Sequence, residues 1–376
     1  MKIGISLFQF FPGKIGGSEE YIIQLITLLP PMLDPSDKVY IFGCRENLSV
    51  FLKQQHPKLI LCEHAIRPLL INLLRFFDLL IPNIFSIYLA KFINALELDV
   101  VLFPQQSIFP HGINTKKIVT IVDFLHDYFP QNFSRLERYI RQKKERYIFS
   151  KSDGIITISK STKKDCCYKF DFPENKCKVI YLGGVNKLVE NVAAYSGIQK
   201  PYILYPAHSY PHKNHTRLIH AFVRFKRKFP QTPSRLILTG KVTSRQLKSM
   251  LKDHEVSQFV QHLGYVSKME LYALLQNCTA LFYPSLFEGF GIPILEGISM
   301  QKPVFCSNLP VFREIVGDTV NYFDPNRIDS IIRQFERIFI NQDLSIDKNK
   351  YREIAQQINW HICADQTLKF LKNSVG

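Results

Sequence analysis

The 376-residue sequence lacks the signatures of several common classes of protein. Its eight cysteines include no Cys-x-x-Cys pair, which argues against a zinc site or a disulfide framework and predicts a reducing compartment. The first residues contain no charged segment followed by an apolar stretch, so we expect no signal peptide and a cytoplasmic protein. The Asp-x-Asp, His-Glu-x-x-His and Gly-x-x-x-x-Gly-Lys-Ser/Thr motifs are absent as well, and we expect no bound metal ion.

Long uncharged apolar runs are also missing. The most apolar stretch, residues 69–92, contains Arg75, Asp78 and Lys91, which make it too polar to span a bilayer. Its leucine and phenylalanine residues fit a helix that lies in a membrane interface, and they equally fit a buried core helix that exposes two charges. The sequence leaves both interpretations open.

Acidic residues are too few to balance the basic ones. The chain has 48 Lys and Arg against 32 Asp and Glu, a formal net charge of +16. Residues 135–178 alone hold thirteen basic and six acidic side chains, and therefore seven of the excess charges. An anionic membrane surface or a nucleic acid attracts such a segment, and a solvated helical face is the third interpretation. Because the sequence contains no nucleic-acid recognition motif or stacking aromatic ladder, we expect no nucleic-acid partner, and we take peripheral attachment to the cytosolic membrane face as a hypothesis.

Strand-like and helical segments alternate along the chain, and hydrophobic residues make up 46% of it, so disorder is excluded. This alternation is typical of parallel α/β sheets. The periodicity is lost over residues 185–200 and then restarts, which indicates a linker between two domains. We predict an N-terminal Rossmann-like domain over 1–190, a C-terminal Rossmann-like domain over 199–358, and a helix over 359–376 that packs back at the domain junction.

Two carboxylates flank a glycine-rich turn directly after an expected buried strand. Glu288 lies in the turn, and Pro293 suits the first helical position, which places Glu296 in the first helical turn. Between them lie Gly289, Phe290 and Gly291. Such carboxylates can accept hydrogen bonds from hydroxyl groups at opposite ends of an elongated ligand, and the free N–H groups around Gly291 can bind phosphate or sugar oxygens. The structural alternative is a tight turn followed by a glutamate that favours the helix N-terminus.

This Glu-x7-Glu spacing resembles the motif of family 4 glycosyltransferases, and the similarity runs through most of the chain. The resemblance implies the GT-B fold, an α/β architecture of two doubly wound Rossmann-like domains that face each other across a cleft. It also implies a retaining hexosyl transfer from a nucleotide-diphosphate sugar to a saccharide or lipid-linked saccharide, with no further cofactor. The segments 123–134 and 212–215 look like those of bacterial mannosyltransferases for surface polysaccharides, which favours GDP-mannose as the donor.

The resemblance assigns roles to residues in the C-terminal domain. Lys213 matches the lysine that binds the donor diphosphate, and His208 stands close before it where many relatives have a Gly-Arg pair. Gly264 matches a loop that holds the nucleotide base, Glu288 is expected to hold the donor-sugar hydroxyls, and Glu296 the ribose diol.

In the N-terminal domain, Gly16 and Gly17 resemble the glycine-rich loop that approaches the donor phosphates. Asp123 resembles the aspartate of a His-Asp loop beside the donor sugar. Many relatives have a histidine directly before that aspartate, where this chain has Val122, and His126 is the nearest candidate for the same part.

Two other functions fit the same residues. A sugar-nucleotide epimerase or hydrolase on the same fold would consume the donor without an acceptor. A non-catalytic basic scaffold would bind a membrane or nucleic acid and no sugar nucleotide.

Overall fold

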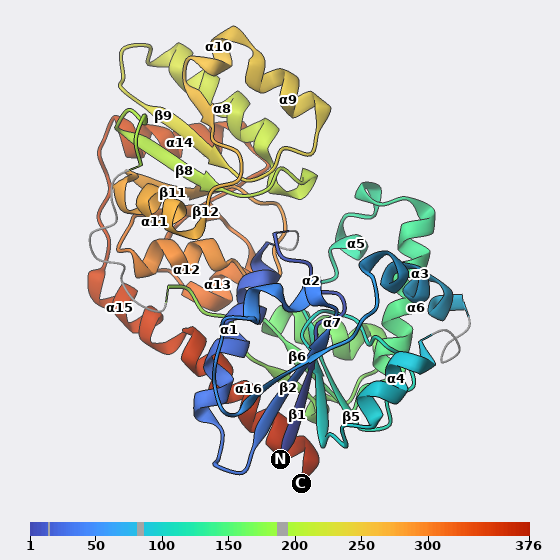
Figure 1. The fold of residues 1–376 in the computed structure, drawn as a ribbon. Coiled ribbons are helices and arrows are strands. Elements are labelled where there is room, and N and C mark those ends of the chain that lie inside the picture. Colours follow the sequence, from blue (N-terminus) through green and yellow to red (C-terminus); the bar gives the residue numbers. More distant parts are fainter. Residues whose placement is uncertain (14–15, 81–85, 186–194) are drawn as a thin grey trace. The chain divides into compact units, whose positions relative to one another are not determined.

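The structure, a computed structural model, describes residues 1–13, 16–80, 86–185 and 195–376. The chain divides into two compact units, which Figure 1 shows in sequence colours. Unit 1 contains residues 1–183 and 360–376, and unit 2 contains residues 184–359. Much of the predicted linker, residues 186–194, lies outside the described residues.

Unit 1 is built on a sheet of parallel strands. Among the described residues it has seven, in the order β3-β2-β1-β4-β5-β6-β7. Their bounds are β1 Lys2–Ser6, β2 Lys38–Gly43, β3 Leu59–Glu63, β4 Val100–Phe103, β5 Lys116–Ile121, β6 Gly154–Thr157 and β7 Cys177–Val179. Ile3 on the central strand lies beside Val39 on one side and Val100 on the other. The strand order reverses between β1 and β4, so their carboxyl ends form a topological switch point.

The helices of unit 1 include one from the end of the chain. They are α1 Gly17–Met32, α2 Arg45–Leu48, α3 Pro68–Leu80, α4 Ile87–Asn94, α5 Leu125–Tyr128, α6 Arg135–Lys151, α7 Lys160–Phe170 and α16 Trp360–Val375. Helix α16 packs on α1 and also contacts β4 and β5. Its Lys372 Nζ lies 3.3 Å from Asp37 Oδ2, and Trp360 is buried. The C-terminal helix is therefore part of the core of unit 1.

Unit 2 repeats this architecture. Its parallel sheet has the order β10-β9-β8-β11-β12-β13, with bounds β8 Tyr202–Pro206, β9 Arg235–Thr239, β10 Val260–His262, β11 Ala280–Tyr283, β12 Val304–Ser307 and β13 Asn321–Phe323. Its helices are α8 His215–Lys228, α9 Arg245–Lys252, α10 His254–Ser257, α11 Lys268–Asn277, α12 Ile292–Ser299, α13 Pro310–Val316, α14 Ile328–Phe339 and α15 Lys348–Gln357. Phe335 of α14 packs against Phe282 of β11 and Phe222 of α8, with ring centroids 4.9 and 5.2 Å apart. The switch point lies between β8 and β11.

No helix within the described part of the chain is both long enough and apolar enough to cross a bilayer. The prediction of two doubly wound α/β domains is confirmed by the two parallel sheets.

Candidate active site

Lys213 and Glu288 meet at the switch point of unit 2. Lys213 ends the short 3-10 helix Pro211–Lys213 that follows β8, and Glu288 lies in the loop that follows β11. Lys213 Nζ donates a hydrogen bond to Glu288 Oε1 at 2.6 Å, and the two side chains are only 15% and 11% exposed. A cation and a carboxylate therefore lie together where open α/β sheets bind their ligands.

Backbone and amide hydrogen bonds fix these two loops to each other. The backbone N–H of Leu286 donates to the carbonyl of His212 at 2.7 Å. Asn214 is buried and has the left-handed φ of 63°, which asparagine tolerates better than most residues. Its Nδ2 donates to the carbonyls of Pro284 and Pro325 at 3.1 and 2.9 Å. The positions of Lys213 and Glu288 are thus set by the fold around them.

Two tyrosines complete the surroundings of Lys213, and neither was among the predicted site residues. Tyr205, near the end of β8, donates its hydroxyl to the Lys213 carbonyl at 2.7 Å. Tyr283, the last residue of β11, accepts a hydrogen bond from Lys213 Nζ at 3.3 Å. Burial raises the pKa of both tyrosines well above the usual value, so both hydroxyls stay protonated at neutral pH. In the sequence, each tyrosine lies at or near the end of a central buried strand, and this position could have indicated a site residue.

The glycine-rich turn leads into α12 by a conformation that favours glycine. Gly291 precedes the helix with a φ of 121°, and a Cβ there would lie 2.7 Å from Cε1 of Phe312. Helix α12 starts at Ile292, one residue earlier than predicted, because Pro293 is also tolerated at the second helical position, where its missing N–H has no intrahelical partner. Glu296 is therefore the fifth helical residue and opens the second turn, which corrects its expected place in the first.

Glu296 has a lysine partner of its own. Its Oε1 accepts a hydrogen bond from Lys268 Nζ at 2.6 Å, and its side chain is 3% exposed against 35% for Lys268. Lys268 is the first residue of α11, whose start is fixed by reciprocal hydrogen bonds between Ser267 and Glu270. The buried carboxylate is thus oriented by a cation that remains accessible. Lys268 was not among the predicted site residues.

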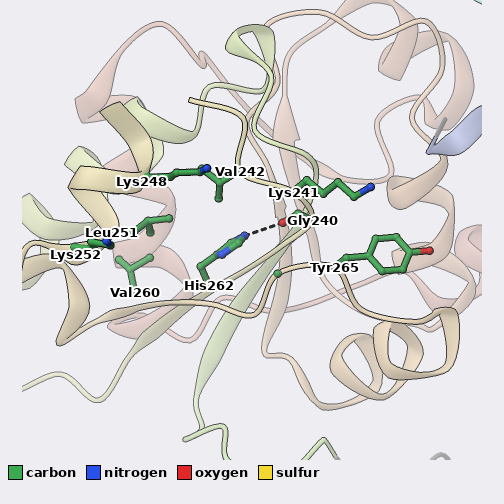
Figure 2. A pocket seen from close by; sticks show the side chains of 10 residues that line it. Gly240, Lys241, Val242, Lys248, Leu251, Lys252, Val260, His262 and Tyr265 are labelled. Carbon is green, nitrogen blue, oxygen red and sulfur yellow. Dashed lines mark hydrogen bonds between the residues drawn. The ribbon is translucent and has the colours of Figure 1, made fainter. Parts of the chain in front are cut away.

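A cavity of about 690 Å³ lies at the carboxyl ends of β9 and β10 (Figure 2), and Gly264 is one of the residues that line it. This volume is in the range of small-molecule sites. His262 Nε2 lies 2.8 Å from the Gly240 carbonyl, and Tyr265 is on the opposite side of the cavity from α9. The α9 side is lined by Lys248, Leu251 and Lys252. The cavity therefore combines aromatic and aliphatic surface with positive charge, which suits a flat heterocycle that carries phosphate.

His208 lies beside this cavity and holds a defined tautomer. Its Nδ1 accepts a hydrogen bond from the backbone N–H of Lys241 at 2.8 Å. Burial lowers the pKa of His208, and the charges of Lys241 and Lys213 lower it further. The neutral ring therefore carries its proton on Nε2, which can donate to an anionic ligand.

The histidines around Lys213 should make unit 2 sensitive to acid. Burial, followed by the charge of Lys213, lowers the pKa of His212 to about 4, and burial lowers that of His215 to about 3. Histidine in an unfolded chain has a pKa near 6.5. Between about pH 6.5 and 4, these two histidines are therefore protonated in the unfolded chain and neutral in the folded unit. Stability should then fall on acidification by about 1.4 kcal/mol per pH unit for each histidine, which urea unfolding at several pH values would measure.

A His215→Phe variant should keep the packing on Tyr205, whose ring centroid lies 4.7 Å from that of His215, and should lose one histidine's share of the slope. The matched control is His220→Phe, at an exposed position of the same helix. Equal slopes in the two variants would contradict the prediction.

The predicted residues of unit 1 lie at the start of α1 and in the segment that follows β5. Gly16 precedes α1 with a φ of 57°, and Gly17 is the first helical residue. Asp123 follows β5, and its Oδ1 accepts a hydrogen bond from the backbone N–H of Leu125 at 2.9 Å. Its backbone carbonyl accepts from Gln106 Nε2 at 3.0 Å.

His126 is 3% exposed, and its Nε2 lies 3.2 Å from Oε2 of Glu145 on α6. Gln106 joins the same cluster, since its Nε2 donates to Glu145 Oε1 at 3.3 Å. Asp123 and His126 are therefore connected through Gln106 and Glu145, neither of which was a predicted site residue. Of the predicted site residues, Gly16, Gly17, Asp123 and His126 belong to unit 1, and the others to unit 2.

Comparison with known proteins identifies the family. The family model described as Glycosyltransferase Family 4 matches residues 15–183, and the model described as Glycosyl transferases group 1 matches residues 194–358. The chain belongs to the family 4 glycosyltransferases. The two matches are separated by ten residues, and each lies mainly within one unit.

Two curated relatives of this glycosyltransferase are O-antigen chain mannosyltransferases. The O-antigen chain mannosyltransferase RfbU of Salmonella typhimurium is 30% identical over 55% of this chain and 56% of its own length. The O-antigen chain mannosyltransferase B of Escherichia coli is 27% identical over 58% of this chain and 60% of its own length. The chain thus matches less than two thirds of the length of either relative.

Solved structures show the same fold at low sequence identity. WaaG, a glycosyltransferase of lipopolysaccharide biosynthesis, has a TM-score of 0.74 at 12% identity, over 98% of this chain and 99% of its own. Anabaena HepE in complex with UDP and glucose has a TM-score of 0.69 at 18% identity, over 99% of this chain and 100% of its own. The predicted GT-B fold is confirmed.

Proposed function

We propose that this chain is a retaining hexosyltransferase that moves a sugar from a nucleotide-diphosphate donor to a saccharide or lipid-linked saccharide. The observation that carries the proposal is the Lys213–Glu288 pair, 2.6 Å apart at the switch point of unit 2, in a chain of this family. A diphosphate leaving group gains negative charge as the glycosidic bond breaks. A cation held beside it lowers the barrier.

Each remaining residue of unit 2 has a part in this proposal. Glu288 accepts hydrogen bonds from donor-sugar hydroxyls, and Glu296 from the ribose diol. The amides around Gly291 and the Nε2 proton of His208 contact phosphate oxygens. The base occupies the cavity beside Gly264. From unit 1, Gly16 and Gly17 approach the diphosphate, and Asp123 and His126 contribute to the surroundings of the sugar. The acceptor binds to unit 1.

For the sugar we propose mannose, with GDP-mannose as the donor. The support is that the two curated relatives described above are mannosyltransferases of O-antigen chains. We also propose polysaccharide or lipopolysaccharide biosynthesis as the setting.

We further propose that the enzyme works in the cytoplasm, attached peripherally to the cytosolic membrane face. Helix α3 supports this, because Leu69, Leu73 and Phe76 are 74%, 48% and 48% exposed on it. The basic segment 135–178 belongs to the same unit. Exposed apolar side chains beside positive charge are typical of surfaces that bind anionic membranes.

The test is a panel of GDP-, UDP-, ADP- and TDP-sugars, read first by thermal unfolding and then by transfer to saccharide acceptors. A donor at 100 times its dissociation constant should add about 2.7 kcal/mol to the stability of the folded chain. We expect one base class to stabilise the protein and GDP-mannose to be the donor used.

The donor is also incubated alone. Release or epimerisation of the sugar without acceptor would favour a hydrolase or epimerase. The absence of a shift with every donor would contradict the proposed function and favour the non-catalytic scaffold.

A further inference from the structure

Basic side chains gather where α3 packs on α6, two helices of unit 1 that lie side by side in Figure 1. The group, called the cation cluster below, consists of Arg75 from α3 and Arg138, Arg141 and Lys144 from α6. The three residues of α6 are spaced three apart, so consecutive ones are neighbours on the helix surface. The proposed glycosyl transfer uses none of them.

The members of the cation cluster act on one another electrostatically. Burial, followed by the positive charges of Arg75 and Arg141, lowers the pKa of Lys144 to about 7. The carboxylate of Glu145 opposes this effect, but Glu145 also lies 3.2 Å from His126 Nε2. The fold therefore holds the basic groups of Arg75, Arg141 and Lys144 close together although they repel one another.

Two acidic residues interact electrostatically with members of the cation cluster, Glu137 with Arg141 and Glu145 with Lys144. None of the four forms an ion pair within the residues that the structure describes. Arg75 Nη1 has only a long hydrogen bond to Asn72 Oδ1, at 3.4 Å. Arg141 lies over the ring of Phe133, with Cζ 4.7 Å from the centroid. The Nε of Arg138 is buried and has no hydrogen-bond partner in the described residues. A buried donor without a partner is costly, and a phosphate oxygen would satisfy it.

Apolar side chains border the cation cluster on both helices. On α3, Leu69, Leu73 and Phe76 are spaced along one outward face and are 74%, 48% and 48% exposed. On α6, Leu136 and Tyr139 are 64% and 53% exposed. Positive charge that converges beside exposed apolar side chains matches the chemistry of a phosphate-bearing amphiphile.

We propose that the cation cluster is a binding site for the phosphate or diphosphate group of a lipid, whose hydrocarbon chain lies along the apolar face of α3. Lipid binding at this site differs from non-specific electrostatic binding to an anionic membrane, because it depends on particular side chains rather than on the net charge of the protein. As a site for the diphosphate of a lipid-linked acceptor, it rests on the proposed function. The binding of a phosphate-bearing lipid to the cation cluster does not rest on the proposed function.

The test compares two variants that each replace two basic residues of the same helix with glutamine. Arg141→Gln with Lys144→Gln removes half of the cation cluster, whereas Arg135→Gln with Arg146→Gln removes two exposed arginines outside it. Each protein is sedimented with phosphatidylcholine vesicles that contain phosphatidic acid, or phosphatidylglycerol at equal surface charge. We expect the wild-type chain to prefer phosphatidic acid, and the cluster variant to bind it at least about tenfold more weakly than the control variant.

If both variants bind the vesicles equally weakly, the attraction is diffuse and the proposal is overturned. An absence of vesicle binding by the wild-type chain would also overturn it. Unfolding midpoints check that both variants are folded. Inorganic diphosphate and a Leu69→Ser, Phe76→Ser variant separate the two sources of phosphate. If the free anion binds as tightly as the lipid and the apolar variant retains vesicle binding, the lipid assignment is wrong. The vesicles contain no donor and no saccharide, so this outcome is independent of the proposed glycosyl transfer.

Discussion

Replacing Lys213 with methionine is expected to lower kcat for glycosyl transfer by about 10²–10³-fold, with a much smaller change in donor affinity. The reason is that the negative charge on the diphosphate grows between the ground state and the transition state. The loss of a fixed cation therefore lowers kcat more than it lowers donor affinity. Single-turnover kinetics with the donor found by the panel would measure the effect. Equilibrium binding of the same donor would separate it from affinity.

The same substitution should also affect stability, because Lys213 neutralises Glu288. Both side chains are largely buried, and removal of one partner from a buried pair costs about 3–5 kcal/mol. A second variant, Lys213→Met with Glu288→Gln, removes both charges and should recover much of that stability. It should not recover turnover. Recovery of both would show that Lys213 acts only on folding and would contradict its role at the diphosphate.

Lys228→Met is the matched control for this experiment. Lys228 Nζ lies 2.8 Å from Glu336 Oε1, but these side chains are 61% and 25% exposed. An exposed ion pair contributes about 0–1 kcal/mol, so the control should leave both stability and turnover nearly unchanged.

The alternation of strands and helices was sufficient to predict two doubly wound domains, because each buried parallel strand is a short apolar run. Right-handed crossovers restrict how such a chain can form a parallel sheet, but they do not by themselves specify the observed strand order. The position of α16 could not be predicted in the same way. Trp360 and Lys372 contact residues far away in the sequence, and no local pattern encodes which unit a terminal helix packs on.

The site was predictable where its residues lie in one segment. Glu288, Gly291 and Glu296 share a single strand, turn and helix, so their spacing could be interpreted directly. Their partners come from other segments. Lys268 is 28 residues from Glu296, and Gln106 is 39 residues from Glu145, so only the fold shows that they are neighbours. The exact start of α12 also depended on the conformation of Gly291, which spacing does not specify.

Glu296→Gln is expected to raise the dissociation constant of the nucleotide sugar by about 10–100-fold while leaving kcat at saturating donor much less affected. A hydrogen bond to a charged group contributes about 1.5–3 kcal/mol, and the ribose diol is equally bound in the ground and transition states. Glutamine keeps the shape of the side chain, whose carboxylate is 3% exposed and oriented by Lys268. The affinity loss should therefore come from the charge rather than from a rearranged loop.

A ligand without the ribose diol tests directly whether Glu296 contacts that diol. A 2′,3′-dideoxynucleoside diphosphate should bind the wild-type chain and the Glu296→Gln variant with similar affinity, since it cannot donate to the carboxylate. Calorimetric titration of both ligands into both proteins forms a thermodynamic cycle whose interaction energy isolates the diol contact. Glu336→Gln serves as the control, because that carboxylate pairs with Lys228 on the exposed surface of unit 2. If the variant weakens both ligands equally, Glu296 acts through the position of Lys268 or the shape of the loop, and its assignment to the ribose is wrong.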